Sequence, residues 1–221
     1  MFQRGFMFKV IQLLFLLMAT PMISNATTVN IGEFSKASLS GWEEKEFDGD
    51  TVYTFTFDDD IKQQVLKAES KAGASGLFRE IRIDLNKTPY LNWSWKTSSY
   101  FPNINENEKA GDDFTARIYV VVDGGYFFWK TIALNYVWSS SHNTDEKWDN
   151  PFTSNATMYA VEAGKEKLGV WQHYKRNIKD DLQRIVGKDE QYIDAIAVMT
   201  DTDNSKRNAT TYFGDIFFTS E

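Results

Sequence analysis

Carboxylate and amide side chains gather at the ends of two predicted strands. Asp112 and Asp113 precede one strand, and Asp201, Asp203 and Asn204 follow another. If the two strand ends are neighbours, several carboxylates share one rim, and their repulsion favours a cation between them. Calcium takes about six to eight oxygen ligands, which alternating Asp and Asn residues of a loop supply. We therefore predict a metal site, with calcium as the expected ion and Asp201, Asp203 and Asn204 as ligands.

Two other roles stay open for residues near this rim. Asp201 and Asn204 can stabilise a turn through hydrogen bonds between their side chains and nearby backbone groups. Arg117 stands in the middle of a predicted strand, where a buried guanidinium needs a carboxylate partner. Asp113 or Asp215 could be that partner. A turn and a structural ion pair therefore compete with the metal site.

Aromatic and polar residues alternate at the end of another predicted strand, in residues 135–138. Aromatic rings stack on sugar rings, while flanking amides and charged groups bind hydroxyls. This chemistry predicts that Asn135, Tyr136, Trp138 and Trp171 contact a polar ligand. The competing explanation is that these rings fill the core of a protein rich in aromatic residues.

Histidine-based chemistry finds little support in the sequence. His142 and His173 are the two histidines of the chain, and no HExxH spacing is present. Two histidines alone do not build a zinc site. Neither a Ser-His-Asp arrangement nor a glycine-rich phosphate loop is indicated. We therefore predict no catalytic residues.

The first 26 residues have the pattern of a secretory signal peptide. Arg4 and Lys9 precede an apolar run at residues 10–18, and small residues at 24–26 offer a cleavage site. The run is shorter than the about 20 residues that a spanning helix needs. We expect cleavage to leave one domain, residues 27–221, that is periplasmic or secreted and not an integral membrane protein.

Charge and cysteine content narrow the class of partner. The net charge of −7 becomes −9 once the two positive charges of the signal peptide are removed. Such an acidic surface argues against nucleic acid and anionic lipid as partners. The chain has no cysteine, so its stability comes from a core without disulfides.

Short strand patterns recur along the chain. Residues 51–57 alternate strictly, and Leu91, Trp93 and Trp95 point one way while polar residues point the other. The pattern at residues 114–122 and 126–138 predicts two strands joined as a hairpin, and the polar stretch at residues 139–151 predicts a loop. About ten or eleven short strands at regular spacing indicate an all-β fold, a β-sandwich of the jelly-roll, galactose-binding-like type, with a closed barrel as the alternative.

The C-terminal part contains one helical pattern and one apolar strand pair. Ile178, Leu182 and Ile185 recur at helical spacing, which predicts a surface helix near residues 174–186. Residues 193–199 are apolar on both faces, and residues 210–218 form a second strand. We expect these two strands to form a hairpin at the centre of the sheet.

Seven short motifs resemble the bacterial exported proteins grouped as DUF3047, a domain of unknown function. They are AGDDF (110–114), RIYV (117–120), LNYVW (134–138), GVW (169–171), RNIKDD (176–181), MTDTDN (199–204) and YFGDI (212–216). They follow one another in order through residues 110–216 of the mature chain. The resemblance implies a domain and no activity. The expected architecture is also similar to that of carbohydrate-binding modules.

These observations predict a binding module for a carbohydrate or another polar ligand. The predicted ligand-binding residues are Asp112, Asp113, Arg117, Asn135, Tyr136, Trp138 and Trp171. One alternative is a glycoside hydrolase or lyase that uses paired rim aspartates. Another is a structural or interaction protein of the cell envelope, which would present a flat apolar patch.

Overall fold

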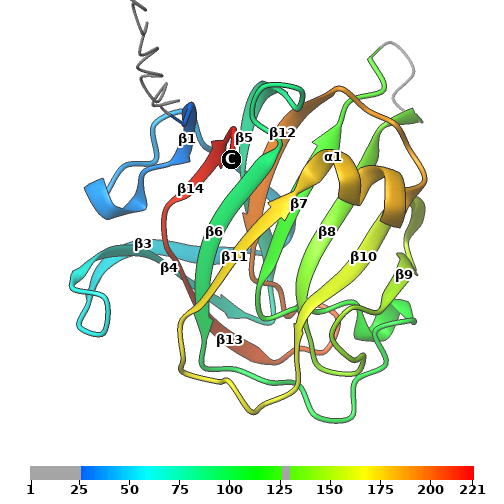
Figure 1. Ribbon diagram of the computed structural model, residues 1–221. Helices are drawn as coiled ribbons and strands as arrows, with labels where there is room; N and C mark the ends of the chain where they lie inside the picture. The colour runs from blue at the N-terminus through cyan, green and yellow to red at the C-terminus, as the bar shows by residue number, and fades with distance from the viewer. Residues whose placement is uncertain (1–25, 126–129) are drawn as a thin grey trace, which may run out of the picture.

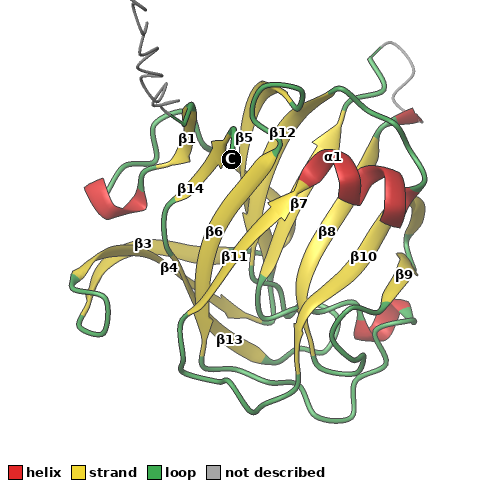
Figure 2. Cartoon of the chain, in the orientation of Figure 1, coloured by secondary structure: helices red, strands yellow, loops and turns green. Residues whose placement is uncertain are grey.

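Two sheets pack face to face in the computed structural model, which describes residues 26–125 and 130–221 (Figures 1 and 2). The first sheet contains β11 (Gln172–Asn177), β6 (Tyr90–Thr97), β14 (Ile216–Thr219), β1 (Thr28–Gly32), β13 (Asn208–Phe213), β4 (Gln63–Lys71) and β3 (Thr51–Asp58). The second contains, in spatial order, β2 (Glu43–Asp48), β5 (Ala74–Asp84), β12 (Tyr192–Met199), β7 (Arg117–Val122), β8 (Ile132–Ser139), β10 (Thr153–Ala163) and β9 (Lys147–Asn150).

The chain crosses repeatedly between the two sheets. It passes from β4 in the first sheet to β5 in the second, returns to β6, and crosses again to β7. Strand pairs within each sheet are antiparallel, except that β10 runs parallel to β8. Such alternation between two sheets is the pattern of a jelly roll. The predicted all-β sandwich of this type is confirmed.

The core follows the side-chain alternation of the strands. Leu91, Trp93 and Trp95 of β6 are at most 3% exposed, as their spacing predicts. Trp93 stacks on Tyr136 of the opposite sheet, with ring centroids 5.1 Å apart. Burial of large aromatic side chains stabilises a fold by about 1.5–3 kcal/mol each. The polar residues of β6 face outward from the first sheet.

One short helix lies where the sequence predicts it, although it begins later. Residues 172–177 pair with β6 as β11, and Asn177 then caps α1 (Ile178–Asp181) by accepting a hydrogen bond from the amide of Asp180. The helix continues as the π-helical turn η4 (Leu182–Val186) and ends at Gly187, whose φ is 79°. It covers the part of β8 and β10 that the first sheet leaves uncovered (Figure 1).

Three expectations about strands are wrong. The strands at residues 193–218 do not form a hairpin, because β12 pairs with β5 and β7 in the second sheet while β13 lies in the first. The final strand is also interrupted at Gly214 and Asp215, between β13 and β14. The predicted loop at residues 139–151 contains β9, which pairs with β10.

Other expectations fall partly outside the described residues. The hairpin of β7 and β8 is confirmed by the pairing of Val122 with Ile132, but residues 126–129 of the predicted second strand are not described. Residues 1–25 of the predicted signal peptide also lie outside the described part. Within the described ranges, no helix has both the length and the apolar character needed to span a membrane.

Candidate functional site

The predicted acidic residues come together at one end of the second sheet. Asp112 and Asp113 precede β7, Asp201 and Asp203 follow β12, and these two strands are paired neighbours. One carboxylate oxygen from each of Asp113, Asp201 and Asp203 lies within 4.8 Å of the others. We call Asp112, Asp113, Asp201 and Asp203 the acidic cluster. The expected proximity of the two strand ends is thus observed.

Most of the acidic cluster is buried. Asp113 is fully buried and accepts hydrogen bonds from the backbone amides of Asn204, at 3.0 Å, and Ser205, at 2.6 Å. Asn204 also donates its side-chain amide to Asp113 at 3.3 Å and to Asp203 at 3.1 Å. Asn204 therefore orients the carboxylates, and Asp113 takes the place in the oxygen triplet that the sequence assigned to Asn204.

Arg117 lies among these carboxylates, with 5% of its side chain exposed. Its Nη2 atom is 3.5 Å from an oxygen of Asp112 and 3.5 Å from one of Asp201. The predicted partners, Asp113 and Asp215, are therefore not its ion-pair partners. Its Nε and Nη2 atoms have no hydrogen-bond partner among the described residues. Arg117 supplies positive charge to the acidic cluster without forming well-aligned hydrogen bonds to its carboxylates.

The acidic cluster has too few positive groups nearby to balance its carboxylates. Burial raises the pKa of Asp201 well above its usual value, although the Arg117 guanidinium opposes this shift. Burial and the charge of Asp113 likewise raise the pKa of Asp203. One guanidinium faces four carboxylates, so ionised carboxylates here repel one another. The oxygen donors of Asp113, Asp201 and Asp203 fit a hard cation such as calcium.

Two of the predicted ligand-binding aromatic residues lie in the core instead. Tyr136 is fully buried and donates its hydroxyl hydrogen to Asp181 of α1 at 2.7 Å. Trp138 is 1% exposed and donates its indole N–H to the carbonyl of Gly164 at 2.9 Å. Both rings face the first sheet, because they alternate with Asn135 and Val137 along β8. Neither ring can stack on a ligand at the surface.

Asn135 points to the other face of the second sheet but is also buried, with 1% exposed. Its Oδ1 atom has no hydrogen-bond partner among the described residues. Phe114, Val137 and Trp148 form a small apolar cluster on this same side of the sheet. Asn135 is therefore not at an open surface where a ligand could reach it directly.

Trp171 lies apart from the acidic cluster, against the first sheet. Its indole N–H donates to Asp58 at 3.1 Å, and the same carboxylate forms an ion pair with Lys96. The ammonium group of Lys96 stands over the rings of Trp171 and Tyr212, at 5.4 and 5.2 Å from their centroids. Trp171 is half-buried, so part of its ring remains accessible.

An open groove of about 490 Å³ runs along the outer face of the first sheet. We call it the sheet groove; its lining includes Gln63, Asn92, Ser94, His173, Lys175 and Phe217. The groove lies where β13 stops pairing with β6 and β14 begins. A Cβ atom on Gly214 would lie 2.3 Å from Ser94 Oγ and 3.7 Å from the Trp171 ring. Glycine at this break therefore lets the Ser94 hydroxyl approach the backbone closely, next to Trp171.

Several polar groups of the sheet groove have no partner among the described residues. The side chains of Gln63, Ser94 and His173 make no hydrogen bond to any described residue. Asp215, in contrast, accepts hydrogen bonds from the backbone and hydroxyl of Ser35. The groove thus offers an amide, a hydroxyl and an imidazole to a ligand. Sequence reasoning did not select these residues, although the alternation of β6 already turns Asn92 and Ser94 outward.

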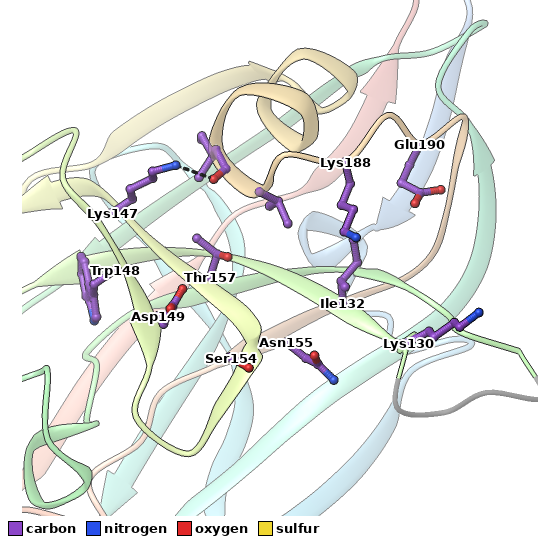
Figure 3. Close-up of a pocket in the computed structure, with 12 residues that line it drawn as sticks. Lys130, Ile132, Lys147, Trp148, Asp149, Ser154, Asn155, Thr157, Lys188 and Glu190 are labelled. Carbon is purple, nitrogen blue, oxygen red and sulfur yellow. Dashed lines mark hydrogen bonds between the residues drawn. The ribbon is translucent and has the colours of Figure 1, made fainter.

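A larger pocket, of about 960 Å³, lies at the end of the helix (Figure 3). We call it the helix-end pocket; its lining includes Ile132, Asp149, Thr157, Ile185, Lys188 and Glu190. No residue of the acidic cluster lines either this pocket or the sheet groove. The two open sites are therefore separate from the acidic cluster.

A family model for DUF3047, described as a protein of unknown function, matches residues 40–217. The chain belongs to this family. DUF3047 thus accounts for nearly the whole sandwich, which agrees with the resemblance carried by the seven motifs. The sequence matches none of the curated proteins.

Solved structures similar to this DUF3047 chain include three carbohydrate-active proteins. The xyloglucanase domain of NopAA from Sinorhizobium fredii has a TM-score of 0.46 and 10% identity, covering 83% of this chain and 96% of that one. A family 29 carbohydrate-binding module from Piromyces equi has a TM-score of 0.40 and 14% identity, covering 90% and 93%. The Endo-D glycoside hydrolase domain from Streptococcus pneumoniae has a TM-score of 0.41 and 10% identity. That match covers 81% of this chain and 22% of the Endo-D domain.

Proposed function

We propose that this protein is an exported binding module for a neutral carbohydrate, which it holds in the sheet groove. The observation that carries the proposal is the set of unpartnered polar groups in an open groove, Gln63, Ser94 and His173. A sugar offers hydroxyl groups that both donate and accept hydrogen bonds, and such groups match an amide, a hydroxyl and an imidazole.

Aromatic side chains beside the groove support a sugar over other polar ligands. Phe217 lines the groove, and Trp171 adjoins it at Gly214. Both rings are half-buried, so each keeps an accessible part; Phe217 lies on β14, and Trp171 directly precedes β11. Rings that are apolar on their faces and flanked by polar groups suit ligands with the same mixed character.

The charge of the groove favours a neutral ligand. Its one carboxylate, Asp215, is engaged by Ser35, and its one lysine, Lys175, stands over the ring of Tyr90 at 4.8 Å. Free ionic groups that would demand a charged partner are therefore few in the described groove. Neutral polysaccharides meet this requirement.

A hydrolase is less well supported by the arrangement of carboxylates. Glycoside hydrolysis needs two carboxyl groups about 5–10 Å apart across a sugar-sized cleft. Asp112, Asp113 and Asp201 are at most 6% exposed and hydrogen-bond or pair within the protein. A buried set of this kind suits a structural ion, and we propose that it binds calcium.

Calorimetric titration with neutral oligosaccharides tests the proposal. Cellohexaose and mannan-derived hexasaccharides are suitable probes. We expect binding to the full chain and a loss of roughly tenfold or more in the Gln63→Ala, His173→Ala double variant, because each side chain supplies hydrogen bonds. Gln183→Ala, on the exposed face of the helix, is the matched control and should bind normally. Unchanged binding by the double variant would place the carbohydrate elsewhere.

A further inference from the structure

The helix-end pocket contains charged groups of opposite sign that do not pair with each other. Lys188 follows the helix, Asp149 lies on β9, and Glu190 precedes β12. Each makes no ion pair and no side-chain hydrogen bond to any described residue. Figure 3 shows Lys188 reaching across the pocket toward Ile132, with Asp149 and Glu190 on either side of it in this view.

The other lining residues include a lysine that already has a hydrogen-bond partner and an apolar floor. Lys147 donates to the carbonyl of Ile185 at 2.7 Å, at the end of the helix, as the dashed line in Figure 3 marks. Ile132 and Ile185 supply apolar surface, and Thr157 adds a hydroxyl. Lys147 therefore holds the helix, and Lys130, which also lines the pocket, has an interaction of its own. Lys188 has no ion pair or side-chain hydrogen bond to a described residue, so its charge is open to a ligand.

These features select one ligand class among three. A ligand with several negative charges would be repelled by Asp149 and Glu190, and a neutral sugar would cover charged groups without pairing them. A small molecule that carries both a carboxylate and an ammonium group could pair with Lys188 and with Asp149 at once. The volume of about 960 Å³ is within the range of small-molecule sites.

We propose that the helix-end pocket binds a small zwitterion, an amino acid or a dipeptide. The ligand carboxylate contacts Lys188, its ammonium group contacts Asp149, and an apolar side chain packs on Ile132 and Ile185. The site is independent of the sheet groove, because the two share no lining residue.

An NMR titration of the full chain with glycyl-L-leucine tests this assignment. We expect the methyl signals of Ile132 and Ile185 to shift with dipeptide concentration. Lys188→Ala and Asp149→Asn should each weaken binding by roughly tenfold, because each removes one charge-assisted contact. Lys165→Ala removes an exposed lysine outside the pocket and should leave binding unchanged. The amide spectrum of each variant shows whether it is folded.

Ligands with a single charge separate the proposal from simpler outcomes. Propionate and propylammonium present the two charges one at a time, and we expect each to bind much more weakly than the dipeptide. If propionate binds as tightly as the dipeptide and only Lys188→Ala weakens it, the pocket is a simple anion site and the proposal is wrong. Absence of any shift, or dipeptide binding by both variants as tight as that of the wild type, also overturns it.

Discussion

The acidic cluster and the sheet groove differ in how their polar groups are satisfied. Asp113 accepts backbone and side-chain hydrogen bonds, and Asp112 accepts two from Asn150 at 2.9 Å. In the sheet groove, the side chains of Ser94 and His173 have no such partner in the part of the chain that the structure describes. The acidic cluster is rich in chemically conspicuous residues but is closed to large ligands. The groove is built from unremarkable residue types that remain free to bind.

The type of a residue says less about ligand binding than the hydrogen-bonding capacity that its side chain leaves unsatisfied. Asp201 is a buried carboxylate with contacts of 3.4 Å to the Phe114 amide and 3.5 Å to Arg117, so it lacks a good donor. That shortage fits a small cation. The free groups of Gln63 and Ser94 fit a ligand as large as a sugar. The following experiments test whether this division is correct.

Trp138→Ala should cause the largest loss of stability. The ring is 1% exposed in the core, and such truncations cost about 3–5 kcal/mol. Trp171→Ala, beside the sheet groove, should cost less and should weaken carbohydrate binding. Chemical denaturation of both variants measures the difference. Equal losses of stability would contradict the assignment of one ring to the core and the other to the sheet groove.

Calcium binding at the acidic cluster should have the second largest effect on the stability of the protein. At a calcium concentration about 100 times the dissociation constant, binding adds about 2.7 kcal/mol to the free energy of unfolding. Thermal melts with EDTA and then with calcium measure the shift. Asp203→Ala should remove the calcium-dependent part, because Asp203 supplies one oxygen of the triplet. An identical melting temperature with and without calcium would assign these carboxylates to turns and ion pairs.

Asp181 provides a reference carboxylate with a full set of donors. It is buried, yet hydrogen bonds from Arg176, Tyr136 and Arg184 outweigh the effect of burial and hold its pKa below the usual value. Its stabilising contribution is therefore complete above the unfolded-state pKa, near 3.8, and is lost as the pH falls through the lower pKa of the folded state. Below about pH 5, the free energy of unfolding from denaturation curves should fall more steeply with decreasing pH in the wild type than in Asp181→Asn. Equal slopes would mean that the Asp181 pKa is not lowered.

Substitutions in the sheet groove should have the smallest effect on stability. The side chains of Gln63 and His173 make no hydrogen bond to any described residue, so replacing either by alanine should change the free energy of unfolding by less than about 0.5 kcal/mol. Denaturation of the variants used for binding checks this directly. A loss of several kcal/mol would show that these side chains serve the fold.

Local sequence patterns predicted much of the fold. The alternation of Leu91, Trp93 and Trp95 gave the inner face of β6, and the spacing of Ile178, Leu182 and Ile185 located the helix. The start of the helix was missed because residues 172–177 pair with β6, a long-range contact that helical spacing does not report. The crossing between β12 and β13 was missed for the same reason.

The site was less predictable than the fold. The acidic cluster was found because strand ends carry adjacent aspartates. Tyr136 and Trp138 were assigned to a ligand on account of their polar neighbours, although alternation with Asn135 already separates the two faces of β8. The sheet groove depends on the break between β13 and β14 and on the pairing of β11 with β6. Neither the break nor the pairing can be predicted from the sequence of a single segment.

The two histidines of the chain allow the most direct test of carbohydrate binding in the sheet groove. His173 lines the groove, whereas His142 stacks on Trp148 on the other sheet, with ring centroids 3.7 Å apart. We would record the imidazole NMR signals of the full chain during titration with cellohexaose and with a mannan-derived hexasaccharide. The account predicts a saturable shift of the His173 signals while those of His142 stay in place. Saturable binding that leaves His173 unmoved would contradict it, as would the absence of binding by either sugar.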